Sequence, residues 1–248
     1  MRLTFALLLF FISVSAFAQA TTVERKIAEA MAANIRSEAE VARDANRKPL
    51  ETLGFFGLED DMRVLELLPG GGWYTKILAP VLRERGELHV AIGTNNVQTN
   101  LLTEPGFDHV NVVDIGVELV RDGQFRTINV APFGFGVEGV DMALTFRNMH
   151  NFTEAGRANV NAAVFAALKP GGLYGVVDHT RRHMEPMTNE NRRRTDVVQI
   201  IKETLAAGFE LVDYSDLHYR PDDELRYEVG RRTVTGNTDR YTLLFRKP

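Results

Sequence analysis

Three consecutive glycines, Gly70, Gly71 and Gly72, follow an apolar segment that contains one carboxylate, Glu66. Glycine has no Cβ and adopts positive φ at little cost, so a glycine run lets backbone N–H groups approach a ligand closely. A helix that begins directly after such a run adds unpaired N–H groups and a partial positive charge. We therefore expect a ligand-binding turn here; a tight connection that binds nothing is the alternative.

The residues on both sides of the glycine run are expected to contact the same ligand. Glu66 would accept hydrogen bonds from an amino group of the ligand or from the backbone N–H groups of the turn. Tyr74 and Thr75 lie in the first turn of the expected helix. Of the aromatic residues Trp73 and Tyr74, the second is better placed to reach a ligand, and packing against the first helix is the alternative for both.

Two histidines are the candidates for proton transfer. His150 follows a strongly apolar segment, at the edge of a sheet where ligands of α/β proteins bind, and Asn148 and Asn151 flank it with further donors and acceptors. We expect His150 to act as a general base, with Asn148 and His179 as the other catalytic candidates. A loop histidine that bonds the backbone is the alternative. Asp178 and the histidines also have metal-ligand chemistry, but no helical HxxxH spacing is present, and we expect no metal site.

The segments around these residues alternate between strand and helix patterns. Apolar runs predict strands over residues 63–68, 88–92, 140–146, 173–177, 209–214 and 241–245. The third strand has two candidates, residues 110–113 and 125–130, with a hairpin-type turn between them. Helices are predicted over residues 23–46, 50–58, 74–83, 153–168 and 196–207. This alternation is typical of a mostly parallel α/β sheet with helices on both faces, and the lack of a crossover helix between residues 215 and 240 predicts an antiparallel last strand.

The first 20 residues have the pattern of a secretory signal peptide. A basic start precedes a nearly continuous apolar run over residues 3–14, and Ala18-Gln19-Ala20 is a small-x-small cleavage site. The run is shorter than the ~20 residues that span a bilayer, which makes a membrane anchor the weaker alternative. We expect export to the periplasm or the medium with cleavage after Ala20, followed by an N-terminal helical cap over residues 21–60 and one α/β domain over residues 61–248.

Composition narrows the possible functions. The chain has 248 residues and a formal net charge of −4, so it is not an obvious binder of nucleic acid or of anionic membranes. It contains no cysteine, which excludes disulfides, thiolate catalysis and zinc sites built on cysteine.

One segment departs from the acidic background. It carries the arginines Arg181, Arg182, Arg192, Arg193 and Arg194. These residues predict either a lid that attracts an anionic small-molecule substrate or a solvated loop, and the ordinary behaviour of exposed charges favours the loop.

The chain resembles the class I S-adenosylmethionine-dependent methyltransferases and, more narrowly, a group of exported predicted methyltransferases. The resemblance rests on the strand, glycine turn and helix start over residues 64–75, on Asp141 to Asn151, and on Leu168-Lys169-Pro170-Gly171-Gly172. It implies a Rossmann-like, mostly parallel seven-stranded sheet, S-adenosylmethionine as the cofactor and methyl transfer to a small molecule. It also implies a set of cofactor-binding residues, namely Glu66, Gly70, Gly71, Gly72, Tyr74, Thr75, Asn95 and Arg147.

Two positions depart from the family pattern. Leu68, followed by Pro69, stands where the family has its first loop glycine. The second strand ends in Ala91-Ile92-Gly93, where the family has an acid that binds ribose hydroxyls, so the neutral amide of Asn95 or its neighbour would have to take that role. The alternatives that remain are a non-catalytic ligand-binding protein on this fold and, less favoured, a nicotinamide-dependent oxidoreductase.

Overall fold

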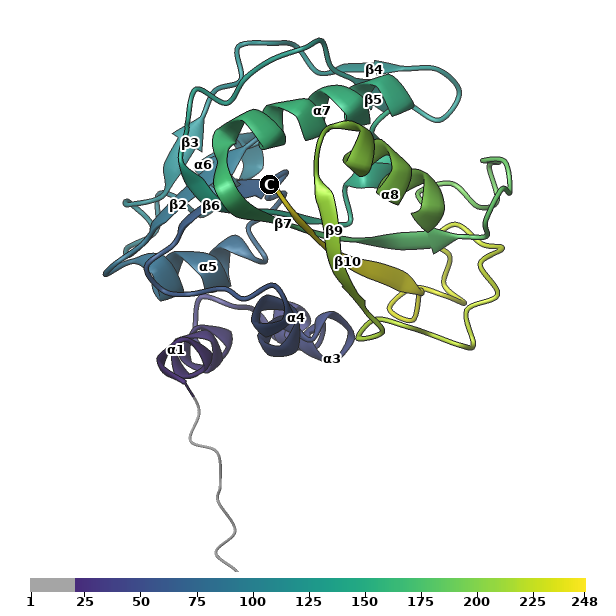
Figure 1. Ribbon diagram of the computed structural model, residues 1–248. Coiled ribbons are helices and arrows are strands. Elements are labelled where there is room, and N and C mark those ends of the chain that lie inside the picture. Colours follow the sequence, from purple (N-terminus) through teal and green to yellow (C-terminus); the bar gives the residue numbers. More distant parts are fainter. Residues whose placement is uncertain (1–20) are drawn as a thin grey trace, which may run out of the picture.

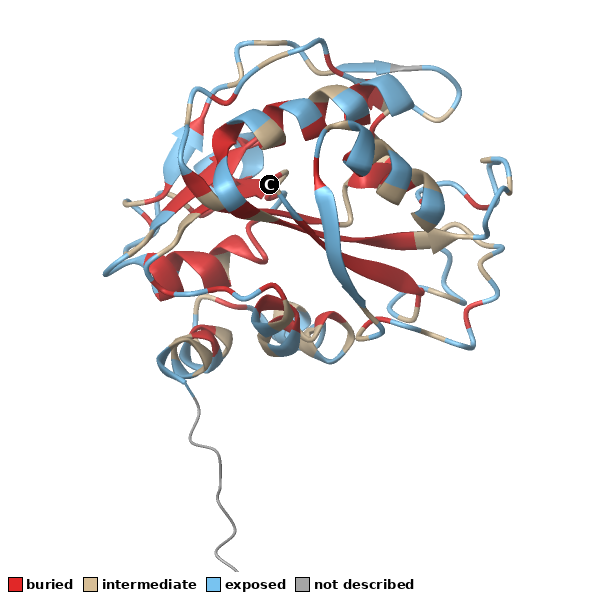
Figure 2. Ribbon diagram, in the orientation of Figure 1, coloured by how far each residue is buried: buried red, intermediate tan, exposed pale blue. Residues whose placement is uncertain are grey.

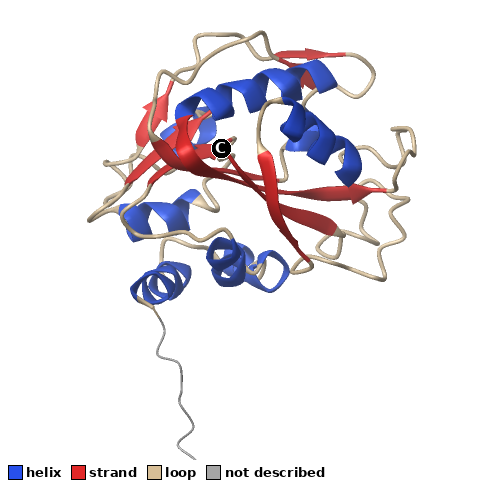
Figure 3. Ribbon diagram, viewed as in Figure 1, coloured by secondary structure: helices blue, strands red, loops and turns tan. Residues whose placement is uncertain are grey.

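The computed structural model describes residues 21–248, and the expected signal peptide over residues 1–20 lies outside this range. One twisted sheet runs through the molecule with helices on both faces (Figures 1 and 3). Its strand order is β3-β2-β1-β6-β7-β10-β9, with β8 paired to the end of β7. The strands are β1 Arg63–Leu67, β2 Glu87–Ala91, β3 Asn111–Val113, β6 Val140–Phe146, β7 Leu168–Arg181, β8 Thr195–Asp196, β9 Glu210–Ser215 and β10 Arg240–Arg246.

The direction of the strands matches the fold expected from the sequence. Strands β3, β2, β1, β6 and β7 are parallel neighbours, and β10 runs antiparallel to both β7 and β9. The predicted antiparallel last strand is therefore confirmed, and it lies inside the sheet. Because β1, β2 and β6 are parallel, their carboxyl ends meet at one edge, where ligands of such sheets bind.

Two apolar cores cover the two faces (Figure 2). The first contains α1 Thr22–Met31, α4 Pro49–Phe55, α5 Thr75–Leu82 and α6 Asn95–Asn100. The second contains α7 Glu154–Ala167 and α8 Val197–Ala206. Side chains alternate between the faces along each strand, so Met142 and Leu144 enter the first core and Ala143 enters the second.

The predicted single helix over residues 23–46 is wrong. The chain forms α1, then the short helices α2 Glu38–Val41 and α3 Asp44–Arg47. Ser37 begins α2 with a capping box, in which its hydroxyl accepts from the N–H of Glu40 and the Glu40 carboxylate accepts from the N–H of Ser37. An apolar period alone does not reveal such a restart.

The ambiguity over the third strand is resolved by pairing. Residues 111–113 form β3 beside β2, whereas β5 Thr127–Asn129 pairs with β4 Val120–Asp122 in a separate hairpin. The structure adds a short helix after β2 that was not predicted, α6, which begins at Asn95. Within residues 21–248, no helix combines the length and the apolarity needed to cross a membrane.

Candidate functional site

The glycine turn joins β1 to α5 and uses its glycines in different ways. Gly70 and Gly72 have φ of +58° and +81°. A Cβ at Gly72 would lie 2.4 Å from Leu101 Cδ2, so a larger residue would have to displace the Leu101 side chain. A Cβ at Gly71 would meet only Asn96 Nδ2, at 3.7 Å, because the residue faces open space. Gly71 is thus the position at which a ligand can approach the backbone.

Three neighbouring strands end in a left-handed residue that is not glycine. Leu68 follows β1 with φ of +48°, Ile92 follows β2 with +64°, and Arg147 follows β6 with +63°. Leu68, which stands at the family's first glycine position, therefore adopts the conformation that glycine would adopt. Each such residue costs about 1 kcal/mol, and strain of this kind gathers at ligand sites.

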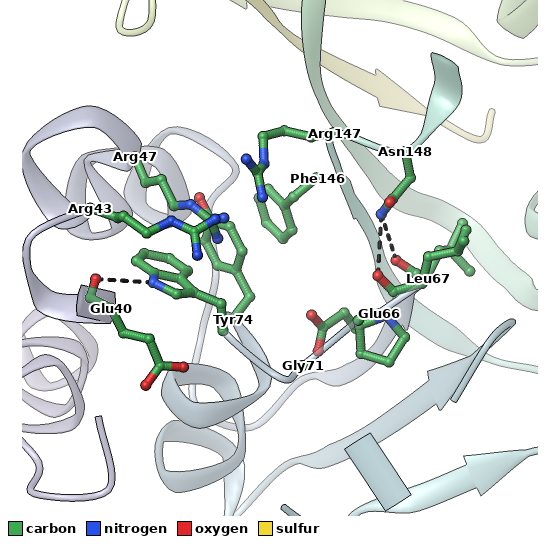
Figure 4. A pocket seen from close by; sticks show the side chains of 14 residues that line it. Glu40, Arg43, Arg47, Glu66, Leu67, Gly71, Tyr74, Phe146, Arg147 and Asn148 are labelled. Carbon is green, nitrogen blue, oxygen red and sulfur yellow. Dashed lines mark hydrogen bonds between the residues drawn. The ribbon is translucent and has the colours of Figure 1, made fainter. Parts of the chain in front are cut away.

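A cavity of about 210 Å³ lies over the carboxyl ends of β1 and β6, and we call it the turn pocket (Figure 4). Its walls come from the glycine turn, from the end of β6 and from the N-terminal helices. Among the sequence candidates, it is lined by Glu66, Gly70, Gly71, Tyr74, Arg147 and Asn148. The structure therefore brings together residues that lie up to 82 positions apart in the chain, from Glu66 to Asn148.

Glu66 supplies the only fully buried carboxyl of the described residues that line the turn pocket. Its Oε2 accepts a hydrogen bond of 2.6 Å from the hydroxyl of Thr75, which is itself buried and does not line the pocket. Burial raises the pKa of Glu66 to about 7, against the lowering effects of Thr75 and of the nearby Arg47 charge. A bound cation would favour the ionised form.

Three arginines line the same pocket: Arg43, Arg47 and Arg147. Only Arg147 was expected from the sequence. Arg47 is buried, with its guanidinium carbon 4.2 Å from the centre of the Trp73 ring. Burial lowers the pKa of Arg47 to about 8, and the charges of Arg147 and Arg43 add to this effect. Burial also lowers the pKa of Arg147, whose buried Nε has no hydrogen-bond partner.

None of these three guanidinium groups forms a salt bridge with a carboxylate of residues 21–248. The other acid of the pocket, Glu40, pairs with Lys76 at 2.9 Å. Figure 4 shows the guanidinium groups of Arg43, Arg47 and Arg147 gathered on one side of the pocket, with Glu66 beside the glycine turn. The pocket thus offers an anion site and a hydrogen-bonding acid within one small volume.

The aromatic residues of the turn both line the pocket and pack. Tyr74 stacks on Phe146 with ring centres 3.5 Å apart, and burial raises the pKa of its hydroxyl to about 12. Trp73 Nε1 donates to the carbonyl of Glu40 at 3.1 Å, which ties the turn to α2. The two alternatives stated for Trp73 and Tyr74 are therefore compatible.

Asn148 and His150, both in the segment that follows β6, line different cavities. Asn148 faces the turn pocket, and its Nδ2 donates to the carbonyls of Leu67 and Leu68 at 3.2 and 3.3 Å. It therefore holds β1 to β6. His150, in the 3₁₀ turn η1 Met149–Asn151, lines two further cavities and not the turn pocket.

A buried carboxylate orients His150. His150 Nδ1 lies 2.7 Å from Asp178 Oδ1, and Asp178 Oδ2 accepts the backbone N–H of His150 at 2.8 Å. Asp178 is fully buried at the end of β7. A carboxylate only accepts hydrogen bonds, so in the neutral imidazole the proton belongs on Nδ1, which leaves the lone pair of Nε2 for a substrate. This is the arrangement that a general base requires.

His179 is a close neighbour of the His150–Asp178 pair. Its ring centre is 5.7 Å from that of His150, and its Nδ1 lies 2.9 Å from the hydroxyl of Thr238. Burial lowers the pKa of His179 well below its ordinary value, with the charge of Arg240 as the next cause. The imidazole is neutral and lines none of the cavities described here. The structure thus places it as a buried neighbour of His150.

Asn95 lies in a different cavity, of about 450 Å³, over the carboxyl ends of β2 and β3. We call it the edge pocket; Ile92, Gly93 and Asp114 also line it. Asp114 was not expected from the sequence. It directly follows β3, and because β3 pairs with β2, its carboxylate lies near the place where the acid of strand two is missing. The sequence could have pointed to Asp114, because it is an acid that directly follows the strand next to β2.

No cluster of three or more His, Asp or Glu side chains suited to a metal ion occurs in residues 21–248. Asp178 and the two histidines are already engaged in the hydrogen bonds described above.

Comparisons with known proteins identify the fold. No family model and no curated protein matches the chain. A methyltransferase from Aquifex aeolicus, described as SAM-dependent, is 13% identical, with 91% of this chain and 98% of that one covered and a TM-score of 0.57. Human N-acetylserotonin methyltransferase, solved in complex with SAM, is 13% identical over 91% of this chain and 56% of that one, with a TM-score of 0.53.

A third similar structure has a different reaction in its name. The cyclase SpnF is 17% identical, with 82% of this chain and 80% of that one covered and a TM-score of 0.55. At these identities the likeness concerns the fold. The chain therefore has the Rossmann-like fold of class I methyltransferases, and its activity has to be argued from its own site.

Proposed function

We propose that this protein is an S-adenosylmethionine-dependent methyltransferase that acts on a small molecule. The observation that carries the proposal is the charge arrangement of the turn pocket, where one buried carboxyl faces the same space as three guanidinium groups without carboxylate partners. The α-amino acid end of S-adenosylmethionine has the complementary pair of charges. The similarity of the fold to methyltransferases supports the same assignment.

The residues present fit this cofactor. Arg43, Arg47 and Arg147 would hold its carboxylate, and Glu66 with the open backbone at Gly71 would hold its amino group. The edge pocket over β2 and β3 would take the nucleoside, with Asn95 and Asp114 as polar partners.

When bound, S-adenosylmethionine would supply a methyl group on a sulfonium, which leaves as a neutral thioether. The protein has to bring the acceptor into line and to exclude water. An acceptor with an O–H group also has to lose a proton, and His150 Nε2 is the base that we assign, with the Asp178 carboxylate stabilising the imidazolium that results.

The location of the protein is part of the proposal. We propose that residues 1–20 direct export, as their basic start, apolar run and cleavage site indicate. The protein would then need a supply of S-adenosylmethionine outside the cytoplasm, or would use the same pocket to bind a ligand without turnover.

The charge argument is tested by calorimetric titration with S-adenosylmethionine and with its decarboxylated analogue. Loss of the charge-assisted hydrogen bonds to the carboxylate should weaken binding of the analogue about 10- to 100-fold. Arg43→Gln should reduce this preference, whereas Arg83→Gln, an exposed arginine outside the pocket, should not. Equal affinity for the two compounds would remove the basis of the proposal. His150→Gln should leave both affinities unchanged.

A further inference from the structure

A second cavity next to His150 is strongly basic. Its volume is about 320 Å³, and we call it the basic cavity. It lies between η1, the β4–β5 hairpin and the arginine segment that follows β7. Its lining includes Arg121, Arg126, Arg192 and Arg193 and, among the residues with described side chains, no acid.

Most of these arginines have no salt-bridge partner among the carboxylates that the structure describes. Arg193 pairs with Glu228. Arg121 donates to the carbonyl of Arg126 at 3.2 Å, and none of Arg121, Arg126 and Arg192 forms a salt bridge with a described carboxylate. In a chain with a net charge of −4, this concentration of unpaired cations in one cavity favours an anionic ligand.

The arginine segment is held in place rather than solvated throughout. Arg194 is fully buried and forms two hydrogen bonds of 2.9 and 3.0 Å to the carboxylate of Asp223. It also donates to the carbonyls of Thr180 and Tyr227. The adjacent Arg192 and Arg193 are thereby fixed at the wall of the cavity. Arg182, Arg192 and Arg193 are exposed, as expected of a solvated loop, and the burial of Arg194 is the departure from that expectation.

The cavity also contains a base and an apolar surface. His150 lines it, with Nδ1 bonded to Asp178 and no described residue bonded to Nε2. Phe125 and Met187 line it as well. A ligand that uses all three features has an oxyanion for the arginines, an apolar body for Phe125 and Met187, and a hydroxyl for His150.

We propose that the basic cavity binds the methyl acceptor, and that this acceptor is a small hydroxylated compound with an apolar body and an oxyanion, a carboxylate or a phosphate. The assignment as acceptor rests on the proposed function, whereas binding of the anion does not. Arg126 and Arg192 are the residues that select it, because guanidinium groups bind both oxyanions in a bidentate manner.

The test measures binding to the purified protein without S-adenosylmethionine. The probes are 4-hydroxybenzoate, 4-hydroxybenzamide as its neutral counterpart, and inorganic phosphate. The wild type should bind 4-hydroxybenzoate at least about tenfold more tightly than the amide, and this preference should weaken as salt is raised. If phosphate competes with 4-hydroxybenzoate, the cavity accepts both oxyanions; if it does not, the acceptor is a carboxylate.

The control is a second double variant with the same change in net charge. The double variant Arg126→Gln/Arg192→Gln should lose the preference for 4-hydroxybenzoate, and Arg25→Gln/Arg83→Gln, two exposed arginines elsewhere, should keep it. Equal binding of benzoate and amide, or equal loss in both double variants, would overturn the proposal. A separate titration with S-adenosylmethionine distinguishes the two proposals. Binding of the anion without binding of S-adenosylmethionine would support the basic cavity as an anion site and would refute the proposed methyltransferase function.

Discussion

Glu66 should make the protein less stable as the pH rises from 4.5 to 8. Its pKa is about 7 in the folded protein, against 4.5 for an ordinary glutamate, because the carboxyl is fully buried. Between these values the folded state holds a proton that the unfolded state has lost. Stability from this group is therefore complete below pH 4.5 and is lost as the pH rises through about 7, and the loss amounts to about 3 kcal/mol at about 1.4 kcal/mol per pH unit.

The substitution Glu66→Gln isolates this effect. Glutamine keeps the shape and an acceptor for the Thr75 hydroxyl but does not ionise. His179 and His218 have lowered pKa values, mainly through burial, and they change stability in the opposite direction below pH 6.5. Both are present in the variant and the wild type, so their contributions cancel in the difference between the two proteins.

The assay is urea denaturation of both proteins at pH 4.5, 6 and 8. The free energy of unfolding of Glu66→Gln, minus that of the wild type, should increase by about 3 kcal/mol from pH 4.5 to pH 8. A difference that stays constant over this range would show that Glu66 ionises normally, and the description of the turn pocket as a buried acid beside unpaired cations would then be wrong.

Three further predictions concern packing, buried charge and the ligand response. Gly72→Ala should lower stability by about 1–3 kcal/mol, measured as a lower melting temperature, because Gly72 has φ of +81° and a Cβ would meet Leu101. Gly71→Ala should change stability little, and equal effects of the two substitutions would contradict the distinct roles of these glycines. Arg194→Leu should lower the free energy of unfolding by about 3–5 kcal/mol, because it leaves Asp223 buried and unpaired. Arg246→Gln, which breaks an exposed salt bridge, should lower it by under about 1 kcal/mol, and similar losses in urea denaturation would refute the anchoring role of Arg194. Trp73 is the one tryptophan of the chain and lines the turn pocket, so its fluorescence should change when S-adenosylhomocysteine binds, and an unchanged spectrum during binding seen by calorimetry would place the ligand elsewhere.

The sheet could be predicted from the sequence because its strands are strongly apolar and bounded by turn residues. The strand predicted over residues 140–146 has the bounds of β6, and the helix predicted over residues 153–168 corresponds to α7 with its cap at Thr153. The restart of the chain at Ser37 could not be predicted from an apolar period, since it depends on a capping box and on the salt bridge of Arg36 to Asp44. Residues 125–130 could not be assigned, because strand propensity does not specify the partner strand.

The candidate site was predictable where it follows the strand ends and not where it depends on tertiary packing. Glu66 and Gly71 follow from the strand–turn pattern, Arg147 is implied by the family resemblance, and all three line one pocket. Arg43 and Arg47 lie at the start and the end of α3, within the expected N-terminal helical cap, and nothing local in the sequence shows that Arg47 packs over Trp73. The pairing of His150 with Asp178 joins the ends of two strands 28 positions apart, and becomes visible only when β6 and β7 are aligned.

The most direct test of the account is calorimetric titration of the purified protein with S-adenosylhomocysteine, using the wild type and Gly71→Val. A valine Cβ at this position has only one neighbour, at 3.7 Å, so the variant should fold and yet block the approach of a ligand to the backbone. The account predicts binding to the wild type and affinity at least about 100-fold weaker in Gly71→Val, or about 2.7 kcal/mol. No binding to the wild type, or equal binding to both proteins, would contradict it.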